Sequence, residues 1–362
     1  MIKYSLIVPV FNRPDEVAEL LESLLQQQRD DYEVILVEDG STVPCEVVAN
    51  AYADRLRLRY FAKANSGPGQ SRNYGAERAE GEYLIILDSD VVVPAGYLAA
   101  IDRELANAPA DAFGGPDRAH ASFTPVQKAI NYSMTSFFTT GGIRGGKKKL
   151  DKFFPRSFNM GIRAEVYRQL GGFSPMRFGE DIDFSYRIVE AGFTTRLFPE
   201  AWVWHKRRAD FRKFYRQVFN SGIARINLTK RHPGTLKLVH LLPMLFTVGV
   251  LLLAALAIVA LVLIALGLVA GYCCGEGCNM GLIMAYAGAF LLCAALLPVA
   301  LYATLIGIDS SAKNHSLHVG LLSVPAAFTQ LMGYGLGFIA AWWRRCVRGQ
   351  DEFQAFEKNF YK

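Results

Sequence analysis

Two patterns of apolar residues divide the chain. Up to Lys237, short apolar runs of β-strand length alternate with segments in which apolar residues recur at helical spacing. Beyond Lys237, Lys, Arg, Asp and Glu are missing from three long stretches, 238–275, 277–308 and 314–343. Each stretch is longer than the ~20 apolar residues with which a helix crosses ~30 Å of hydrocarbon. The sequence therefore predicts an α/β domain followed by a membrane region.

Strand and helix signals alternate in the first part of the chain. They predict a strand at 4–10, a helix at 16–28 capped by Asp15, a strand at 33–37, a helix at 71–79 and a strand at 83–87. Strands that alternate with helices are typical of a mostly parallel sheet with right-handed crossovers. Because ligands bind such sheets beyond the carboxyl ends of the strands, the residues at those ends are the first candidates for a functional site.

Acidic and amide residues follow the predicted strands. Asn12 follows the first strand, Asp39 the second, and Asp88 and Asp90 the third. Two carboxylates at this spacing suit Mg²⁺ or Mn²⁺ held against a diphosphate, although Asp-x-Asp also ends strands without any metal. Asp39 offers an acceptor to a uracil or ribose edge, or it is only a residue of an Asp-Gly turn.

Three further side chains suit the same chemistry. Arg72 lies near the start of a predicted helix, where the positive helix end and a guanidinium both favour phosphate. His205 offers an imidazole as a third metal ligand, and Asn159 offers an amide to a sugar hydroxyl. Each has an ordinary interpretation as well: a surface arginine, a surface or capping histidine, and a turn-forming asparagine. The residues alone leave both interpretations open.

Five segments, taken in their order along the chain, resemble the family 2 glycosyltransferases, which have the GT-A fold. The segments are 5–12, 33–41, 69–75, 88–90 and 179–181. The resemblance implies a nucleotide-sugar donor, with uridine as the preferred nucleoside, and inversion at the anomeric carbon. The donor-binding residues predicted on this basis are Pro9, Asn12, Asp39, Arg72, Asp88 and Asp90, with Asp90 leading in metal binding. Asp181 is the predicted catalytic base and Glu180 its supporting neighbour.

Inverting transfer needs a carboxylate that takes the proton of the acceptor hydroxyl and a divalent ion that stabilises the leaving diphosphate. Glu180, Asp181 and Asp183 meet at a predicted transition from loop to helix. We expect Asp183 to cap the first helical turn and Asp181 to lie in the preceding loop, facing the sugar. The glycine-rich and lysine-rich segment 141–149 is predicted to be a lid over the bound donor.

Other functions fit the sequence less well. The segment 216–220 departs from the Gln-x-x-Arg-Trp motif of the long polysaccharide synthases of this family, which favours single-sugar transfer over a processive synthase. A nucleotidyltransferase is disfavoured because the first turn, 11–14, is not a glycine-rich phosphate loop. A receptor or carrier is disfavoured because the apolar stretches hold no charged residue to form a substrate path.

The predicted organisation is a GT-A domain at 1–225, a basic collar at 226–237, a membrane region at 238–343 and a cytoplasmic tail at 344–362. Basic residues flank both ends of the membrane region, so we expect both ends to be cytoplasmic and the number of crossings to be even. We therefore expect 238–272 and 282–308 to cross, and 317–343, which is rich in Gly and holds Pro325, to be re-entrant or interfacial. The first residues do not resemble a signal peptide. The catalytic domain is accordingly expected at the cytoplasmic face of the inner membrane.

Charge and cysteine content refine the expected partners. The net charge is +6, and the segment 206–237 holds ten Lys or Arg residues against one acid, Asp210. Directly before a membrane segment, this pattern predicts contact with anionic membrane lipid rather than with nucleic acid. The expected partners are therefore a nucleotide-sugar donor, a lipid-linked or glycan acceptor, and membrane lipid. Cys273, Cys274 and Cys278 give only a faint metal signal, and the cysteines do not suggest a disulfide framework.

Overall fold

The computed structural model describes residues 2–118, 122–140, 153–176, 178–206, 208–274, 279–353 and 355. They form two compact units. Unit 1 comprises 1–123, 147–207 and 228–235, and unit 2 comprises 124–146, 208–227 and 236–362. The chain therefore enters unit 2 before the predicted boundary at 225 and returns briefly to unit 1 after it. The predicted lid at 141–149 and the side chains of the cysteine cluster lie outside what the structure describes.

Unit 1 is built on two sheets. The strands are β1 (Tyr4–Val10), β2 (Tyr32–Asp39), β3 (Leu58–Lys63), β4 (Tyr83–Leu87), β5 (Val91–Val92), β6 (Ala112–Gly114), β7 (Asp117–Arg118), β8 (Asn159–Arg163), β9 (Thr195–Leu197) and β10 (Val203–His205). The larger sheet has the order β3-β2-β1-β4-β8-β6-β9, and the smaller one β5-β10-β7. Strands β3, β2, β1 and β4 are parallel, whereas β8 runs antiparallel to both β4 and β6. The predicted parallel sheet is confirmed, and a mixed half extends it.

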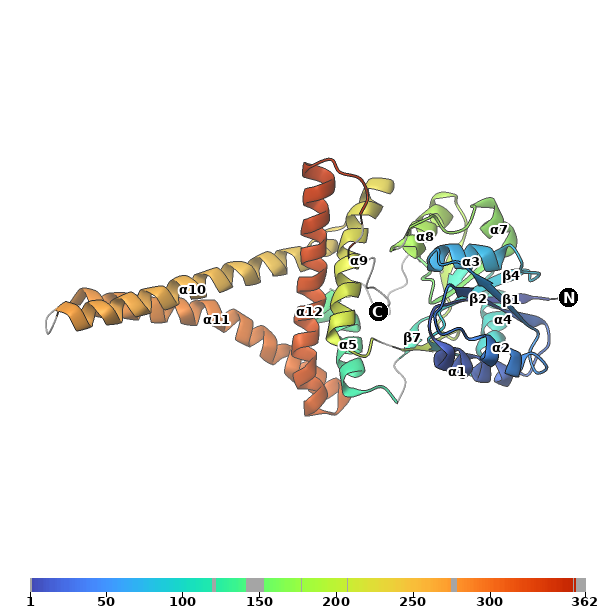
Figure 1. The fold of residues 1–362 in the computed structure, drawn as a ribbon, viewed down its shortest axis with the longest axis horizontal. Helices are drawn as coiled ribbons and strands as arrows, with labels where there is room; N and C mark the ends of the chain where they lie inside the picture. The colour runs from blue at the N-terminus through green and yellow to red at the C-terminus, as the bar shows by residue number, and fades with distance from the viewer. Residues whose placement is uncertain are drawn as a thin grey trace. The chain divides into compact units, whose positions relative to one another are not determined.

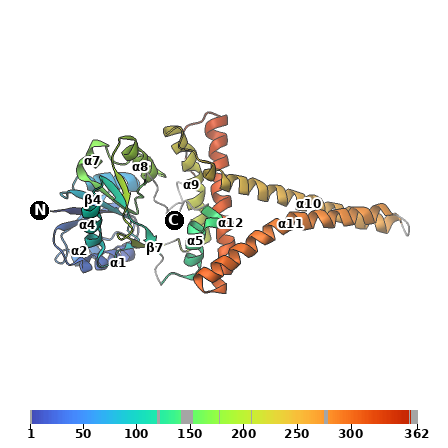
Figure 2. The ribbon, with the colours of Figure 1, turned by 180° about the vertical axis from the view of Figure 1, so that it is seen from behind.

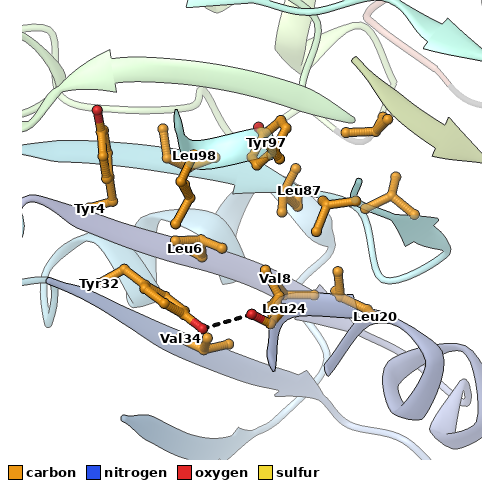
Figure 3. Packing of buried hydrophobic residues seen from close by; sticks show 14 of the residues in the cluster. Tyr4, Leu6, Val8, Leu20, Leu24, Tyr32, Val34, Leu87, Tyr97 and Leu98 are labelled. Atoms are coloured by element: carbon orange, nitrogen blue, oxygen red, sulfur yellow. Dashed lines mark hydrogen bonds between the residues drawn. The ribbon is translucent and has the colours of Figure 1, made fainter. Parts of the chain in front are cut away.

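Helices cover both faces of the larger sheet, as Figure 1 shows. One face carries α1 (Pro14–Leu24), α2 (Glu46–Tyr52) and α4 (Tyr97–Asn107), and the other α3 (Pro68–Ala76), α7 (Ala164–Gln169) and α8 (Glu180–Glu190). Alternate side chains of β1 join the two cores, which is why its apolar run is nearly continuous. Figure 3 shows the α1 side, where the Tyr32 hydroxyl donates to the Leu24 carbonyl at 2.8 Å.

Helix α1 differs from its prediction at both ends. It begins at Pro14, whose fixed φ suits the first helical position, and its N-cap residue Arg13 makes no side-chain cap. Asp15 lies inside the first turn, so the predicted Asp15 cap is wrong. The end of the predicted helix is instead a 3₁₀ turn, Leu25–Gln27, followed by Gln28 at φ 50°. Strand β3 was not predicted, because this edge strand is only partly buried and lacks an apolar run.

The regular secondary structure of unit 2, among its described residues, consists of helices. Its helices are α5 (Pro125–Thr135), α6 (Phe137–Thr140), most of α9 (Phe211–Arg231), α10 (Leu242–Cys274), α11 (Asn279–Asn314) and α12 (Leu317–Trp342). Helices α10 and α11 form a long hairpin, and α5, α9 and α12 run side by side across one end of it (Figures 1 and 2). By length and composition, three helical segments could cross a membrane: Leu238–Tyr272, Asn279–Asn314 and Leu317–Val347.

Small residues let the helices of unit 2 approach closely. A Cβ added at Gly337 of α12 would lie 2.0 Å from the Phe219 carbonyl oxygen of α9. A Cβ added at Gly288 of α11 would lie 2.7 Å from the Ala260 carbonyl oxygen of α10. Lipid is as apolar as leucine, so helices in a membrane associate through such close packing rather than through hydrophobic burial. The composition of unit 2 is consistent with packing in lipid.

Gly161 of β8 offers a test of the packing in unit 1. A Cβ at this position would lie 2.0 Å from the Phe113 ring, which is itself stacked on Phe198 at 4.4 Å between ring centroids. We expect Gly161→Ala to lower the free energy of unfolding by about 2 kcal/mol, measured by thermal unfolding in detergent. The control is Gly96→Ala, because a Cβ there meets no atom within 4 Å. Equal stability of the two variants would contradict this packing.

Candidate active site

Every predicted site residue lies in unit 1, and several follow the carboxyl ends of its parallel strands. Asp39 is the last residue of β2, and Asp88 directly follows β4. Strands β2, β1 and β4 are parallel neighbours, so these ends share one edge of the sheet. This is the edge at which α/β sheets bind ligands.

Asp88, Asp90 and His205 form a candidate metal site. One ligand atom of each lies within 4.8 Å of the others. The His205 Nε2 atom lies 3.2 Å from Asp90 Oδ1 and 3.8 Å from Asp88 Oδ2. Two carboxylates and one imidazole are donors that fit Mn²⁺, and Mg²⁺ when water completes the shell. The chemistry of these donors therefore fits the divalent ion that the sequence predicted.

Strand pairing explains how His205 reaches two residues more than a hundred positions earlier. Strand β10 pairs antiparallel with β5, and the register sets His205 opposite Val91, the residue after Asp90. The Phe158 ring stacks on the imidazole at 5.1 Å between centroids. Asp117 of β7 brings Oδ2 to 3.9 Å from His205 Nδ1, the nitrogen that faces away from the other two carboxylates. At 3.9 Å this contact is longer than a hydrogen bond, so Asp117 is an acidic neighbour of the ring and not a hydrogen-bond acceptor that orients it.

The Arg13 side chain supplies a positive charge at the same site. Its guanidinium pairs with Asp90, and the charges of Asp90, Glu16 and Asp88 together outweigh the effect of burial, so the pKa of Arg13 is raised. A fixed cation is thus already paired with one of the predicted metal ligands. The pairing shows that this carboxylate lies in surroundings that favour a positive charge.

Arg72 connects the candidate metal site to the acidic pair on α8. Its guanidinium is buried and donates to Asp88 Oδ1 at 2.8 Å and to Glu180 Oε1 at 2.9 Å. It also lies over the Phe173 ring, 5.2 Å from the centroid. In the structure, Arg72 therefore holds two carboxylates together. Its predicted contact with the nucleotide stays a prediction.

Glu180 and Asp181 are neighbours with opposite pKa shifts. Burial raises the pKa of Glu180 to about 7, against the opposing charge of Arg72. Burial also acts to raise the pKa of Asp181, but the Arg156 guanidinium, whose Nε donates to Asp181 Oδ2 at 2.6 Å, outweighs it, and the net shift is downward. Asp181 is therefore the member of the pair that stays ionised near neutral pH.

The local structure around this pair differs from the prediction. Helix α8 begins at Glu180 after Gly179, which has φ 84°, so Asp181 lies in the first helical turn and not in a preceding loop. The helix has no side-chain cap. Asp183 accepts from the Ser174 hydroxyl at 2.6 Å and from Arg187 Nε at 3.1 Å, and so does not have the predicted capping role.

Asp39 lies beside the start of α3, the helix that carries Arg72. Its carboxylate accepts from the backbone N–H groups of Ser66 and Gly67, both at 2.9 Å, and pairs with Lys63. These contacts fix the carboxylate where the chain turns into α3. A carboxylate acceptor and a lysine donor thus stand side by side at the end of β2.

Three predicted site residues have structural contacts. Asn12, at φ 53°, accepts from the backbone N–H of Thr42 at 2.8 Å and so ties two strand ends together. Pro9 lies within β1, opposite Val37. Asn159 is buried, accepts from the Tyr97 hydroxyl at 2.6 Å and donates to the Ala201 carbonyl at 2.8 Å. These contacts give the Asn159 amide a structural role and do not favour its predicted contact with sugar.

A hollow of about 480 Å³ lies near the candidate metal site, between α1 and the small sheet. Its lining residues include Ala18, Val92, Phe123 and Trp204. Trp204 precedes His205 on β10, and successive strand side chains point to opposite faces. The hollow and the candidate metal site thus lie on different sides of β10.

The sequence did not reveal the arginines and the lysine that pair with the acidic residues. Arg13, Lys63 and Arg156 each pair with a residue that the sequence predicted: Asp90, Asp39 and Asp181. Arg13 stands at the end of β1 beside the other predicted residues, and this position is a signal that could have been used. For Arg156 the sequence offers no such signal.

Comparison with known proteins identifies the class that this fold and site define. Residues 5–171 match the model of the family "Glycosyl transferase family 2". The match supports a family 2 glycosyltransferase domain with the GT-A fold in this part of the chain, and long apolar helices that could span a membrane follow it.

Two relatives illustrate the similarity. The chain is 34% identical over 204 residues to the uncharacterized glycosyltransferase EpsJ of Bacillus subtilis, covering 54% of this chain and 56% of EpsJ. It is 33% identical over 117 residues to the GalNAc(5)-diNAcBac-PP-undecaprenol beta-1,3-glucosyltransferase of Campylobacter jejuni, covering 32% of this chain and 38% of that protein. The chain spans well under two thirds of the length of these curated relatives, and only 13% of another.

A solved structure supports the fold. The mannosyltransferase PcManGT from Pyrobaculum calidifontis, in complex with GDP-Man and Mn²⁺, matches with a TM-score of 0.55. The match covers 96% of this chain and 88% of that chain at 16% sequence identity. At this identity the likeness is evidence for the fold alone.

The candidate metal site predicts direct binding of Mn²⁺. Even changes behind metal ligands commonly cost 10–100-fold in affinity, so we expect Asp90→Asn and His205→Ala to weaken Mn²⁺ binding about tenfold or more in calorimetry. The control is Asp54→Asn, which changes an exposed acid in the turn after α2; the Mn²⁺ affinity of this variant should equal that of the wild type. Unchanged binding in both site variants would show that these residues do not hold the ion.

Proposed function

We propose that the protein transfers a single sugar from a nucleotide diphosphate sugar, a UDP-sugar, to a lipid-linked or glycan acceptor, with inversion at the anomeric carbon. The observation that carries the proposal is the chain of contacts from the metal site through Arg72 to the acidic pair, Glu180 and Asp181. It joins a site for a diphosphate and its ion to a site for proton removal, the two parts that such a transfer needs.

The donor end of the proposed site is built from Asp39 and the metal site. Asp88, Asp90 and His205 would hold Mg²⁺ or Mn²⁺, which when bound would offset the negative charge of the leaving diphosphate. Asp39 and Lys63 present an acceptor next to a donor, and uracil offers both an N–H and carbonyl oxygens to such a pair. Pro9 and Asn12 shape the strand end beside them.

The proton-accepting role is assigned to Asp181. A general base has to be ionised before it can take the proton of the acceptor hydroxyl. The net pKa shift of Asp181 is downward, whereas burial raises the pKa of Glu180 to about 7. Both carboxylates are paired with an arginine, Glu180 with Arg72 at 2.9 Å and Asp181 with Arg156 at 2.6 Å. The opposite pKa shifts therefore favour Asp181 as the base, and Glu180 as the group that positions Arg72.

The acceptor proposal rests on the membrane region and on one relative. The name of the Campylobacter jejuni relative gives it a substrate linked to undecaprenol through a diphosphate. An acceptor of this kind stays in the membrane, and unit 2 has helices that are apolar enough to lie there. A lipid-linked acceptor would thus meet a transferase held at the same membrane surface. We place the catalytic domain on the cytoplasmic side, where nucleotide sugars are made.

From the packing of unit 2 we assign its helices two membrane roles: α10 and α11 cross the bilayer, and α12 lies at its surface. Helix α12 lies beside α9, which carries Arg212, Lys213 and Arg216 and so suits the polar interface rather than hydrocarbon. The two helices run across the α10–α11 hairpin (Figures 1 and 2). If the hairpin crosses the bilayer, α12 lies along its surface. This assignment keeps the number of crossings even and both ends of the region cytoplasmic.

Substitution of the proposed base tests the function. We expect Asp181→Asn to fold, to bind a nucleotide sugar, and to lose ~10²–10⁴-fold in kcat, because a proton acceptor is gone while binding contacts stay. The measurement is transfer by the purified full chain from a panel of nucleotide sugars to a diphospholipid-linked sugar, with Mn²⁺ present. The length of the product separates single addition from a processive synthase. Near-normal transfer by Asp181→Asn together with an inactive Glu180→Gln would reverse the two roles.

Cysteine accessibility tests the proposed topology. In a variant whose only cysteine is the exposed Cys346, we expect a membrane-impermeant maleimide to react from the cytoplasmic side of vesicles. In a variant that keeps only Cys278, between the two helices of the hairpin, the reagent should react from the opposite side. Labelling of Cys346 from the outer side alone would mean an odd number of crossings.

A further inference from the structure

His232 follows α9 directly, in the segment 228–235 that belongs to unit 1. Its side chain is 8% exposed. Its backbone N–H donates to the Leu228 carbonyl at 2.8 Å, and its own carbonyl accepts from the Thr235 hydroxyl at 2.8 Å. The sequence pattern places it only within a basic collar. In the structure it is instead a buried histidine with a fixed backbone.

The imidazole of His232 bridges two carboxylates of α8. Its Nε2 atom lies 3.0 Å from Asp183 Oδ1, and its Nδ1 atom lies 3.0 Å from Glu190 Oε1. The ring also packs against Tyr186 at 5.0 Å between centroids. Residues 183, 186 and 190 follow one another at the spacing of a single helix face. One ring therefore holds two turns of α8 along that face.

Asp183 is also held from its other side. Its second oxygen accepts from the Ser174 hydroxyl at 2.6 Å and from Arg187 Nε at 3.1 Å. Arg187 in turn donates to the carbonyls of Leu170 and Gly172, at 2.8 and 2.6 Å. With His232 on one oxygen and this group on the other, Asp183 has contacts on both sides that oppose rotation of α8 about its axis.

These contacts act on the turn that carries the acidic pair. Glu180, Asp181 and Asp183 all belong to the first turn of α8, which has no side-chain cap. The preceding Gly179 has φ 84° and adds no side chain that could hold the turn. The direction in which the Asp181 carboxylate points therefore depends on its own pairing with Arg156 and on what fixes the helical turn at Asp183. A shift of about 1 Å in a reacting group can cost on the order of 10²-fold in rate.

We propose that His232 is a positioning residue for the acidic pair: by bridging Asp183 and Glu190 it fixes the first turn of α8 in the orientation that sugar transfer needs. The proposal rests on the proposed function, in which Asp181 is the base. His232 itself touches neither the metal site nor the acidic pair in any contact found among the described residues. Its effect on the reaction passes through Asp183.

The test compares His232→Phe with His232→Arg. Phenylalanine keeps the packing on Tyr186 but has no donor, whereas a guanidinium offers donors to both carboxylates. We expect His232→Phe to lower kcat about tenfold or more while the KM for the nucleotide sugar changes less than about twofold, since the donor contacts stay. His232→Arg should recover most of kcat, and Mn²⁺ affinity should stay constant in both. The matched control is His318→Phe, an exposed histidine, with wild-type kcat.

A double-mutant cycle identifies the route of the effect. If His232 acts through Asp183, the loss of kcat caused by His232→Phe should largely vanish in an Asp183→Asn background. His232→Gln, which keeps one amide donor, replaces His232→Phe if the latter does not fold. A lower unfolding temperature with unchanged kcat per folded molecule would overturn the proposal, because the bridge would then only stabilise the fold.

Asp181→Asn, measured alongside, separates the positioning role of His232 from the proposed function. An inactive Asp181→Asn with an unaffected His232→Phe contradicts the positioning role and leaves the proposed function intact. An active Asp181→Asn contradicts the base assignment, and with it the reason for positioning this turn. Loss of kcat in both variants, with coupling of His232 to Asp183, supports the proposal.

Discussion

The buried guanidinium of Arg72 is the interaction on which the arrangement of the site depends. Carboxylates from the end of β4 and from the start of α8 approach each other here, and like charges that close repel one another. Arg72 donates to Asp88 at 2.8 Å and to Glu180 at 2.9 Å, so one side chain sets how far apart the two groups lie. Removing one partner of a buried ion pair costs about 3–5 kcal/mol, because the other charge stays behind. The candidate metal site and the acidic pair are therefore parts of one electrostatic unit.

The same principle extends to the other acids of the site. Asp90, Asp39 and Asp181 pair with Arg13, Lys63 and Arg156, respectively. A folded domain could not bring these acids together at one sheet edge without nearby cations, since each buried carboxylate without a partner would gain a proton or open the site to water. The basic residues of unit 1 thus make an acidic site compatible with a folded core. They also leave it surrounded by cations that suit an anionic diphosphate.

The sequence predicted the parts of the site that local signals carry. Buried strands are visible as apolar runs, so the sheet edge with Asp39, Asp88 and Asp90 could be located, and the motif order pointed to Asp181. The sequence could not predict contacts that depend on the pairing of segments far apart in the chain. The register that sets His205 opposite Val91 involves strands of two and three residues, too short to give any pattern. The bridge from His232 to Asp183 depends on where a helix ends relative to another, and periodicity carries no such information.

The membrane region shows the same limit in another form. Composition marks α10, α11 and α12 alike as apolar and long, because hydropathy counts residues and ignores what covers them. Packing distinguishes them. In the most apolar 18-residue part of each helix, 6% of the residues of α10 and 11% of those of α11 are buried within the protein, against 44% for α12. A helix that other helices cover gains little from contact with lipid tails, whereas a hairpin with exposed apolar sides cannot rest in water. The cover on α12 comes in part from α9, whose arginines and lysines need polar surroundings. Because α12 packs against this charged helix, we propose that α12 lies at the membrane surface while the hairpin crosses.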